Sequence, residues 1–129
     1  MQRSESQYPA DWLRLAEKDW SRAEYLLKSD DTEAAGFFLQ QAIEKFLKAF
    51  LLSHGWKLRR THDLEALLNE AIEYDASLEI FRSDCQMITV FYLIERYPLS
   101  TEPVTTETDI RENIERAKAL VDKLRQAIG

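Results

Sequence analysis

The hydrophobic residues of this chain recur at helical spacing along most of its length. The broadest apolar segment runs from Phe37 to Leu52 and is followed by Gly55. Its polar positions form only a narrow strip: Gln41, Glu44, Lys45 and Lys48. A helix that is apolar around most of its circumference needs neighbours on several sides. In a chain this short, the pattern predicts a helical bundle and a second subunit.

Turn and capping residues divide the first half of the chain into two helices. The first is expected from Trp12 to Lys28, with Asp11 as its N-cap. The second is expected to start at a Thr32 cap and to end near Ser53, with Gly55 as its C′ residue. The pattern therefore predicts two long consecutive helices.

The second half of the chain shows three more helical patterns. A third helix is expected from a Thr61 cap to about residue 74. A fourth, also broadly apolar, runs from Leu78 until Pro98 forces it to end near residue 96. Thr106 and Asp109 resemble a capping box, from which a last helix continues to the end of the chain.

Composition agrees with this periodicity. Three glycines and three prolines among 129 residues leave few turn residues for a many-stranded protein. We therefore expect an all-α chain that forms a single domain over residues 1–129, with no internal repeat or linker.

Charge and residue counts exclude several kinds of function. A formal charge of −6 argues against broad, sequence-independent binding of nucleic acid. The single Cys85 lies in an apolar helical pattern and is expected in the core. The spacing of the histidines and acidic residues fits no metal site, so neither a metal nor another cofactor is predicted. No signal peptide or membrane span is recognisable, which predicts a cytoplasmic protein.

The predicted connections place one group of basic residues together. If sequential helices alternate in direction, the loop after Gly55, the end of the fourth helix, and the starts of the first, third and fifth helices share one end of the bundle. Five side chains of that end can bind an anion such as a nucleotide or an RNA phosphate: Lys57, Arg59, Arg60, His62 and Arg96. Structural roles compete with this reading, since the loop cations can be merely solvated and Arg96 can interact with its helix dipole.

Three segments together resemble the HEPN domain family. They are residues 35–55, with Gly-Phe-Phe-Leu-Gln-Gln-Ala-Ile-Glu-Lys at their centre, then Thr61-His62-Asp63-Leu64, then Phe91-Tyr92 leading to Arg96-Tyr97-Pro98. The resemblance implies an up-and-down bundle of four long helices plus a shorter one, usually a homodimer. It also implies a minimal nucleotidyltransferase as protein partner, in a complex or a toxin–antitoxin pair.

Many members of that family are metal-independent ribonucleases. In these, an arginine at the position that Arg96 matches is followed four to six residues later by a histidine, and the pair lies in a cleft between two subunits. Here Tyr97 and Pro98 follow Arg96, and no histidine occurs beyond His62. The resemblance therefore implies no complete catalytic pair unless His62 takes the role.

Three functional hypotheses follow. The leading one is a non-catalytic, dimeric HEPN module that binds a nucleotidyltransferase partner, with a nucleotide or phosphate contact at Lys57, Arg59, Arg60, His62, Arg96 and Tyr97. The second is a ribonuclease toxin that uses Arg96 with His62. The third is a purely structural bundle. Which helices would form the interface of a dimer is left open by the sequence.

Overall fold

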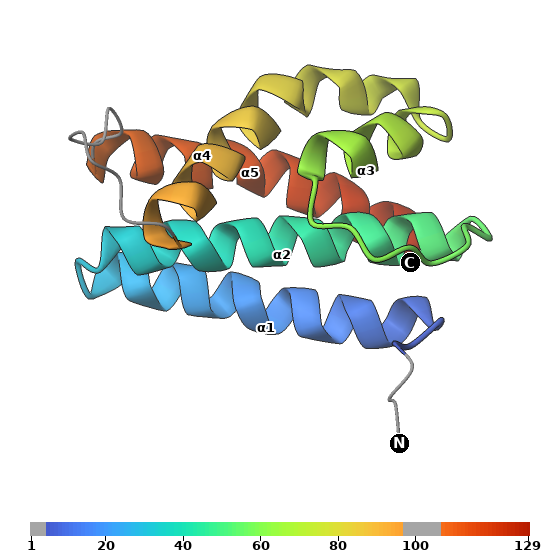
Figure 1. The fold of residues 1–129 in the computed structure, drawn as a ribbon, viewed down its shortest axis with the longest axis horizontal. Helices are drawn as coiled ribbons and strands as arrows, with labels where there is room; N and C mark the ends of the chain where they lie inside the picture. The colour runs from blue at the N-terminus through green and yellow to red at the C-terminus, as the bar shows by residue number, and fades with distance from the viewer. Residues whose placement is uncertain (1–4, 97–106) are drawn as a thin grey trace.

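The computed structural model describes residues 5–96 and 107–129. The described chain is all-α, as predicted, and contains no strand in these ranges. Its elements are α1 (Pro9–Lys28), α2 (Thr32–Ser53), α3 (Leu64–Ile72), the 3-10 helix η1 (Ala76–Phe81), α4 (Arg82–Arg96) and α5 (Glu107–Ile128). Figure 1 shows α1, α2 and α5 lying along one another, with α3, η1 and α4 covering one side.

The first helix begins earlier than its apolar pattern suggested. Pro9 is its first residue, and Tyr8 is an N-cap without a side-chain cap bond. A proline suits this position because its φ is already helical and its missing N–H would have no partner in the helix. The prediction of Asp11 as N-cap is therefore wrong. Asp11 lies within the first turn, where Oδ2 accepts a hydrogen bond of 2.6 Å from Ser6 Oγ.

Two other predicted caps are also displaced onto aspartates. Asp31 caps α2 by accepting from the backbone N–H of residue 34, and Thr32 is the first helical residue. Asp63 caps α3 by accepting from two backbone N–H groups, whereas Thr61 Oγ1 accepts from the N–H of Asp63 at 3.2 Å. A carboxylate next to the helix start gives a charge-assisted cap that the neutral threonine does not. The predicted Thr106 cap lies outside the described residues.

The end of α2 follows the prediction and turns the chain back. Gly55 has a φ of +82°, in the region that favours glycine. The Gly55 N–H donates to the carbonyl of Leu52, and the Trp56 N–H donates to the carbonyl of Leu51. Trp56 and Leu58 then pack against a small buried cluster that includes Leu52. The chain after α2 is thereby anchored along the bundle.

The central helix α2 is enclosed within its own chain. It contacts α1, α3, α4 and α5, and fourteen of its 22 residues are buried. The expectation that this segment needs a second subunit is therefore wrong. The fourth helical segment is different, because Met87, Val90 and Leu93 of α4 remain exposed.

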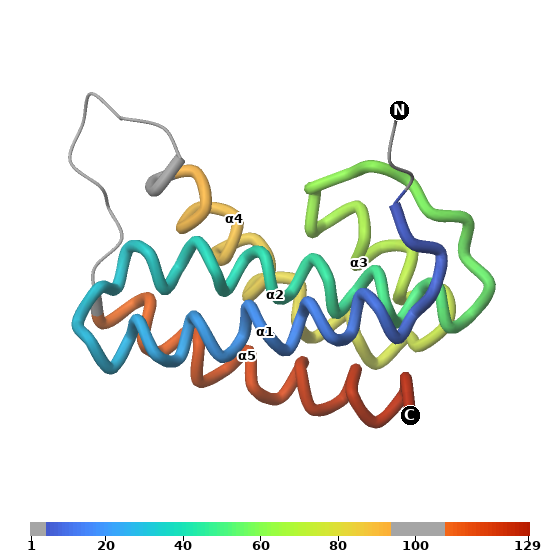
Figure 2. The backbone as a smooth tube through the Cα atoms, turned by 90° about the horizontal axis from the view of Figure 1, so that it is seen from below, coloured from blue at the N-terminus to red at the C-terminus, as the bar shows by residue number. Residues whose placement is uncertain are grey.

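The direction of α3 overturns the predicted gathering of helix ends. The segment after Gly55 returns along α2, so α3 starts beside the middle of α2 and runs in the same direction (Figures 1 and 2). Consequently α4 ends beside the start of α2, where a Cβ built on Gly36 would lie 2.9 Å from Phe91 Cβ. The start of α5 lies there too, since Arg111 bonds Asp30 at 2.9 Å. The starts of α1 and α5 are thus at opposite ends.

Candidate functional site

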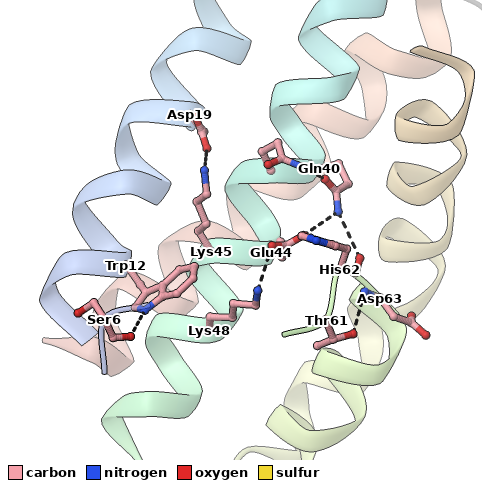
Figure 3. A network of polar contacts seen from close by, with 11 residues as sticks. Ser6, Trp12, Asp19, Gln40, Glu44, Lys45, Lys48, Thr61, His62 and Asp63 are labelled. Carbon is pink, nitrogen blue, oxygen red and sulfur yellow. Dashed lines mark hydrogen bonds and ion pairs between the residues drawn. The ribbon is translucent and has the colours of Figure 1, made fainter. Parts of the chain in front are cut away.

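Two residues of the polar strip of α2, Glu44 and Lys48, form a buried network with Gln40 (Figure 3). Glu44 and Lys48 are 3 % and 2 % exposed, and their side chains form an ion pair of 3.1 Å. Gln40 Nε2 donates to Glu44 Oε1 at 3.3 Å. Lys48 Nζ also lies 5.0 Å from the ring centroid of Trp12, within cation–π range. Buried charges of this kind require such partners, and here they come from the ion pair itself, from Gln40 and from Trp12.

His62 is attached to this network from the surface. Its Nδ1 lies 2.9 Å from Glu44 Oε1, and its carbonyl accepts from Gln40 Nε2 at 3.4 Å. Its side chain is 73 % exposed. A carboxylate that accepts from Nδ1–H leaves Nε2 of a neutral ring as a proton acceptor. The arrangement can therefore hold a surface imidazole in one orientation.

A second buried carboxylate lies between α1 and α2. Asp19 is 2 % exposed and bonds both Lys45 Nζ and Arg22 Nη1, the latter at 2.8 Å. Figure 3 shows Lys45 reaching from α2 to Asp19 on α1. Two cations on one carboxylate leave this group of side chains with a net positive charge.

The loop cations predicted to bind an anion differ in their surroundings. Arg59 bonds Glu70 and lies 5.9 Å from the ring centroid of Trp56, so it ties the loop to α3. Lys57 and Arg60 are exposed and have no partner within residues 5–96 and 107–129. Lys57, Arg60 and His62 together form the loop site, which lies along the segment between α2 and α3.

The structure does not bring Arg96 to the loop site. Arg96 is the last residue of α4, and Tyr97 lies outside the described residues. Phe91 lies level with Gly36, and α4 continues from there away from Glu44, the contact of His62. The eight residues from Gly36 to Glu44 alone span about 12 Å at 1.5 Å per residue. His62 and the backbone of Arg96 are therefore far apart within one chain.

Comparison with known proteins places the chain in a family. Its sequence matches the family described as the HEPN domain over residues 9–127, nearly its full length. This chain belongs to the HEPN domain family. A crystal structure of an archaeal HEPN homologue is similar, with 27 % sequence identity and a TM-score of 0.73, covering 95 % of this chain and 98 % of that one. No match was found among curated proteins.

Other chemistry of this HEPN domain is limited by burial. Cys85 is fully buried, as predicted, and burial together with the nearby Asp84 carboxylate raises the pKa of its thiol to about 12. It is therefore no thiolate at neutral pH.

The described residues contain no group of three or more histidine, cysteine, aspartate or glutamate side chains placed to hold a metal ion. None of the described helices is long and apolar enough to cross a membrane.

The sequence pattern revealed the polar strip of α2 but not that Glu44 and Lys48 within it are buried. The strip reads as the water-facing side of a helix, and nothing in its own spacing shows that α1 and the segment before α3 cover it. The pairing of Glu44 with Lys48 at positions i and i+4 was the available signal, since this spacing lets opposite charges neutralise each other.

Proposed function

We propose that this HEPN domain is a non-catalytic interaction module that forms a dimer through α4 and binds a nucleotidyltransferase partner. The loop site offers a contact for a nucleotide or phosphate. The observation that carries the proposal is an apolar stripe on α4. Met87, Val90 and Leu93, spaced three residues apart on one face, are 41 %, 41 % and 43 % exposed.

An apolar stripe of this kind is unusual on the surface of a monomeric protein. The opposite face of α4 is already packed, because Ile88 and Phe91 are buried in the core. Large exposed aliphatic side chains in a row are typical of an interface, whereas scattered ones are ordinary. Ile80 of η1, two residues before α4, is also exposed, at 74 %. A second copy placed stripe to stripe would give a twofold interface.

The positions of the histidines support a non-catalytic role. The chain has only His54 and His62. His54 follows α2 and stacks on Tyr74 with ring centroids 4.6 Å apart. His62 is held by Glu44 near the middle of α2. Because α4 ends beside the start of α2, neither histidine lies near the backbone of Arg96 in the same chain.

The dimer is tested by light scattering on the purified protein at micromolar concentration. We expect twice the mass of one chain for the wild type and the mass of one chain for Val90→Glu. Leu15→Glu is the matched control, because Leu15 of α1 is 36 % exposed and lies off the stripe. It should stay dimeric. A wild-type protein that remains a single chain would overturn this part of the proposal.

The non-catalytic role is tested by RNA cleavage. We expect no cleavage above that of a mock purification, and normal growth of cells that express the protein alone. Cleavage that is lost in both His62→Ala and Arg96→Ala would instead favour the ribonuclease toxin. Co-purification with the product of a neighbouring nucleotidyltransferase gene tests the partner. If the two co-expressed proteins do not associate, the proposal of a nucleotidyltransferase partner is refuted.

A further inference from the structure

The imidazole of His62 is exposed to solvent, yet its orientation is fixed from inside the bundle. Its Nδ1 lies 2.9 Å from Glu44 Oε1, and the Glu44 side chain is 4 % exposed whereas that of His62 is 73 % exposed. Gln40 Nε2 donates both to the same carboxylate oxygen and to the His62 carbonyl, as Figure 3 shows. The ring and the backbone that carries it are therefore both held against α2.

The contact with Glu44 decides which ring nitrogen of His62 is available for reaction. A carboxylate only accepts hydrogen bonds, so the proton of a neutral ring lies on Nδ1 and the lone pair lies on Nε2. Within residues 5–96 and 107–129, no hydrogen bond or ion pair reaches Nε2. A carboxylate bonded to Nδ1–H also stabilises a positive charge that forms on the ring. His62 therefore presents an exposed nucleophilic nitrogen, and Glu44 can stabilise its charged product.

The charges around this imidazole admit an anionic reactant. An unpaired carboxylate beside the ring would repel an anion, but Lys48 Nζ lies 3.1 Å from Glu44 and balances its charge. Asp63, the next residue along the chain, accepts from two backbone N–H groups at the start of α3. Lys57 and Arg60 are exposed cations without a partner in the described part of the chain. Together these groups leave a net positive charge at the loop site.

We infer that Nε2 of His62 accepts a phosphoryl group from a small acyl phosphate. Nε2 attacks the phosphorus atom, and the N–P bond forms as the P–O bond to the carboxylate leaving group breaks. The leaving oxygen keeps the electron pair, and the Nδ1 proton stays on the ring, which becomes a cation facing Glu44. The modification consumes one donor per chain, so it agrees with a non-catalytic role. It rests on the proposed function only in placing a phosphate at the loop site.

His54 provides a reference within the same chain. It is also exposed, but its ring contacts those of Phe50 and Tyr74, each with a centroid distance of 4.6 Å. In the described ranges, no hydrogen bond reaches either of its ring nitrogens. No carboxylate therefore selects one nitrogen of His54 or stabilises the ring after phosphorylation. Its reaction measures what an exposed imidazole does without an orienting carboxylate.

Incubation of the purified protein with acetyl phosphate, followed by mass spectrometry and phosphorus NMR, tests the inference. We expect His62 to be phosphorylated about tenfold faster than His54, because its hydrogen bond to Glu44 becomes charge-assisted as the ring gains charge. The NMR spectrum should assign the phosphate to Nε2. His62→Asn should abolish this signal, and His54→Asn should leave the rate at His62 unchanged.

Glu44→Gln combined with Lys48→Met removes the carboxylate without leaving an unpaired buried charge. The rate at His62 should fall about tenfold, to that of His54, in protein shown by circular dichroism to be folded. Lys118→Met, at an exposed position of α5, is the control and should keep the wild-type rate. Equal rates at the two histidines, phosphate on Nδ1, or an unchanged rate in the folded double variant would each overturn the inference.

The comparison of His62 with His54 in the wild type decides the matter even if the double variant does not fold. Light scattering reports the α4 dimer independently of phosphorylation. Failure of this inference and failure of the proposed dimer therefore give different results.

Discussion

Replacing Lys48 with methionine tests the buried network that links α2 to the loop site. Methionine has nearly the length of the lysine side chain, so its packing against Trp12 is largely kept. The substitution removes the ammonium group that lies 3.1 Å from Glu44. Glu44 is then a carboxylate with 4 % of its side chain exposed and no permanent cation beside it.

The expected cost is large because both members of the pair are buried. Removing one partner of a buried ion pair costs about 3–5 kcal/mol. We expect the lower part of that range, about 3 kcal/mol, because Gln40 still donates to Glu44 and His62 still contacts it. A domain of this size has a free energy of unfolding of about 5–15 kcal/mol, so the loss is a large fraction of the total.

Urea denaturation followed by circular dichroism measures this loss. Urea is preferred to guanidinium chloride because a salt would screen the charges under study. At a fixed protein concentration, the midpoint should fall by about 1–2 M. Glu44→Gln combined with Lys48→Met should recover part of the loss, since it also removes the unpaired charge. Lys118→Met is the control, because its ion pair with Glu115 is exposed and contributes at most about 1 kcal/mol.

A loss of less than about 1 kcal/mol in Lys48→Met, equal to that of the exposed control, would refute the reasoning. It would mean that water reaches Glu44 and Lys48 in solution. A double variant less stable than Lys48→Met would also contradict it. In that case the energy would lie in the hydrogen bonds of Glu44 rather than in its charge.

Three further predictions concern packing, capping and pH. Gly36→Ala should shift α4, because the new Cβ would lie 2.9 Å from Phe91 Cβ. Urea denaturation should show that the free energy of unfolding falls by about 1–3 kcal/mol. An unchanged midpoint would contradict the close packing of the two helices. Asp63→Ala removes two cap hydrogen bonds and should cost about 1 kcal/mol in the same assay, whereas Asp63→Asn should keep most of it. The raised pKa of Cys85 means that only the unfolded thiol ionises between pH 9 and about 12. The free energy of unfolding should therefore fall more steeply with pH across that range in the wild type than in Cys85→Ala. Equal dependence of stability on pH in the two proteins would show that the thiol reaches water.

Local periodicity was sufficient for much of the helical framework. The bounds of α2 and its Gly55 end follow from residues within a few turns of one another. Apolar spacing and helix-ending glycines act through the backbone of their own segment, so they can be read without knowing what lies beside it. The threonine caps were predicted wrongly, because Asp31 and Asp63 stand within two residues of Thr32 and Thr61 and offer the same kind of capping oxygen.

The direction of α3 could not be read in this way. The segment between Gly55 and Leu64 is long enough either to start a new antiparallel helix or to return along α2. Packing of Trp56 and Leu58 against the cluster around Leu52 selects the return. That choice carries α4 to the opposite end and separates Arg96 from His62, so the predicted common cationic end does not form.

For this protein, the sequence alone determined the helical class, the positions of most helices and the family, because these depend on spacing along one chain. Only the tertiary structure decided that Glu44 and Lys48 are buried, that α2 needs no second subunit and that the exposed apolar surface belongs to α4. Burial depends on which segments cover a helix, and contacts between residues distant in sequence set that covering.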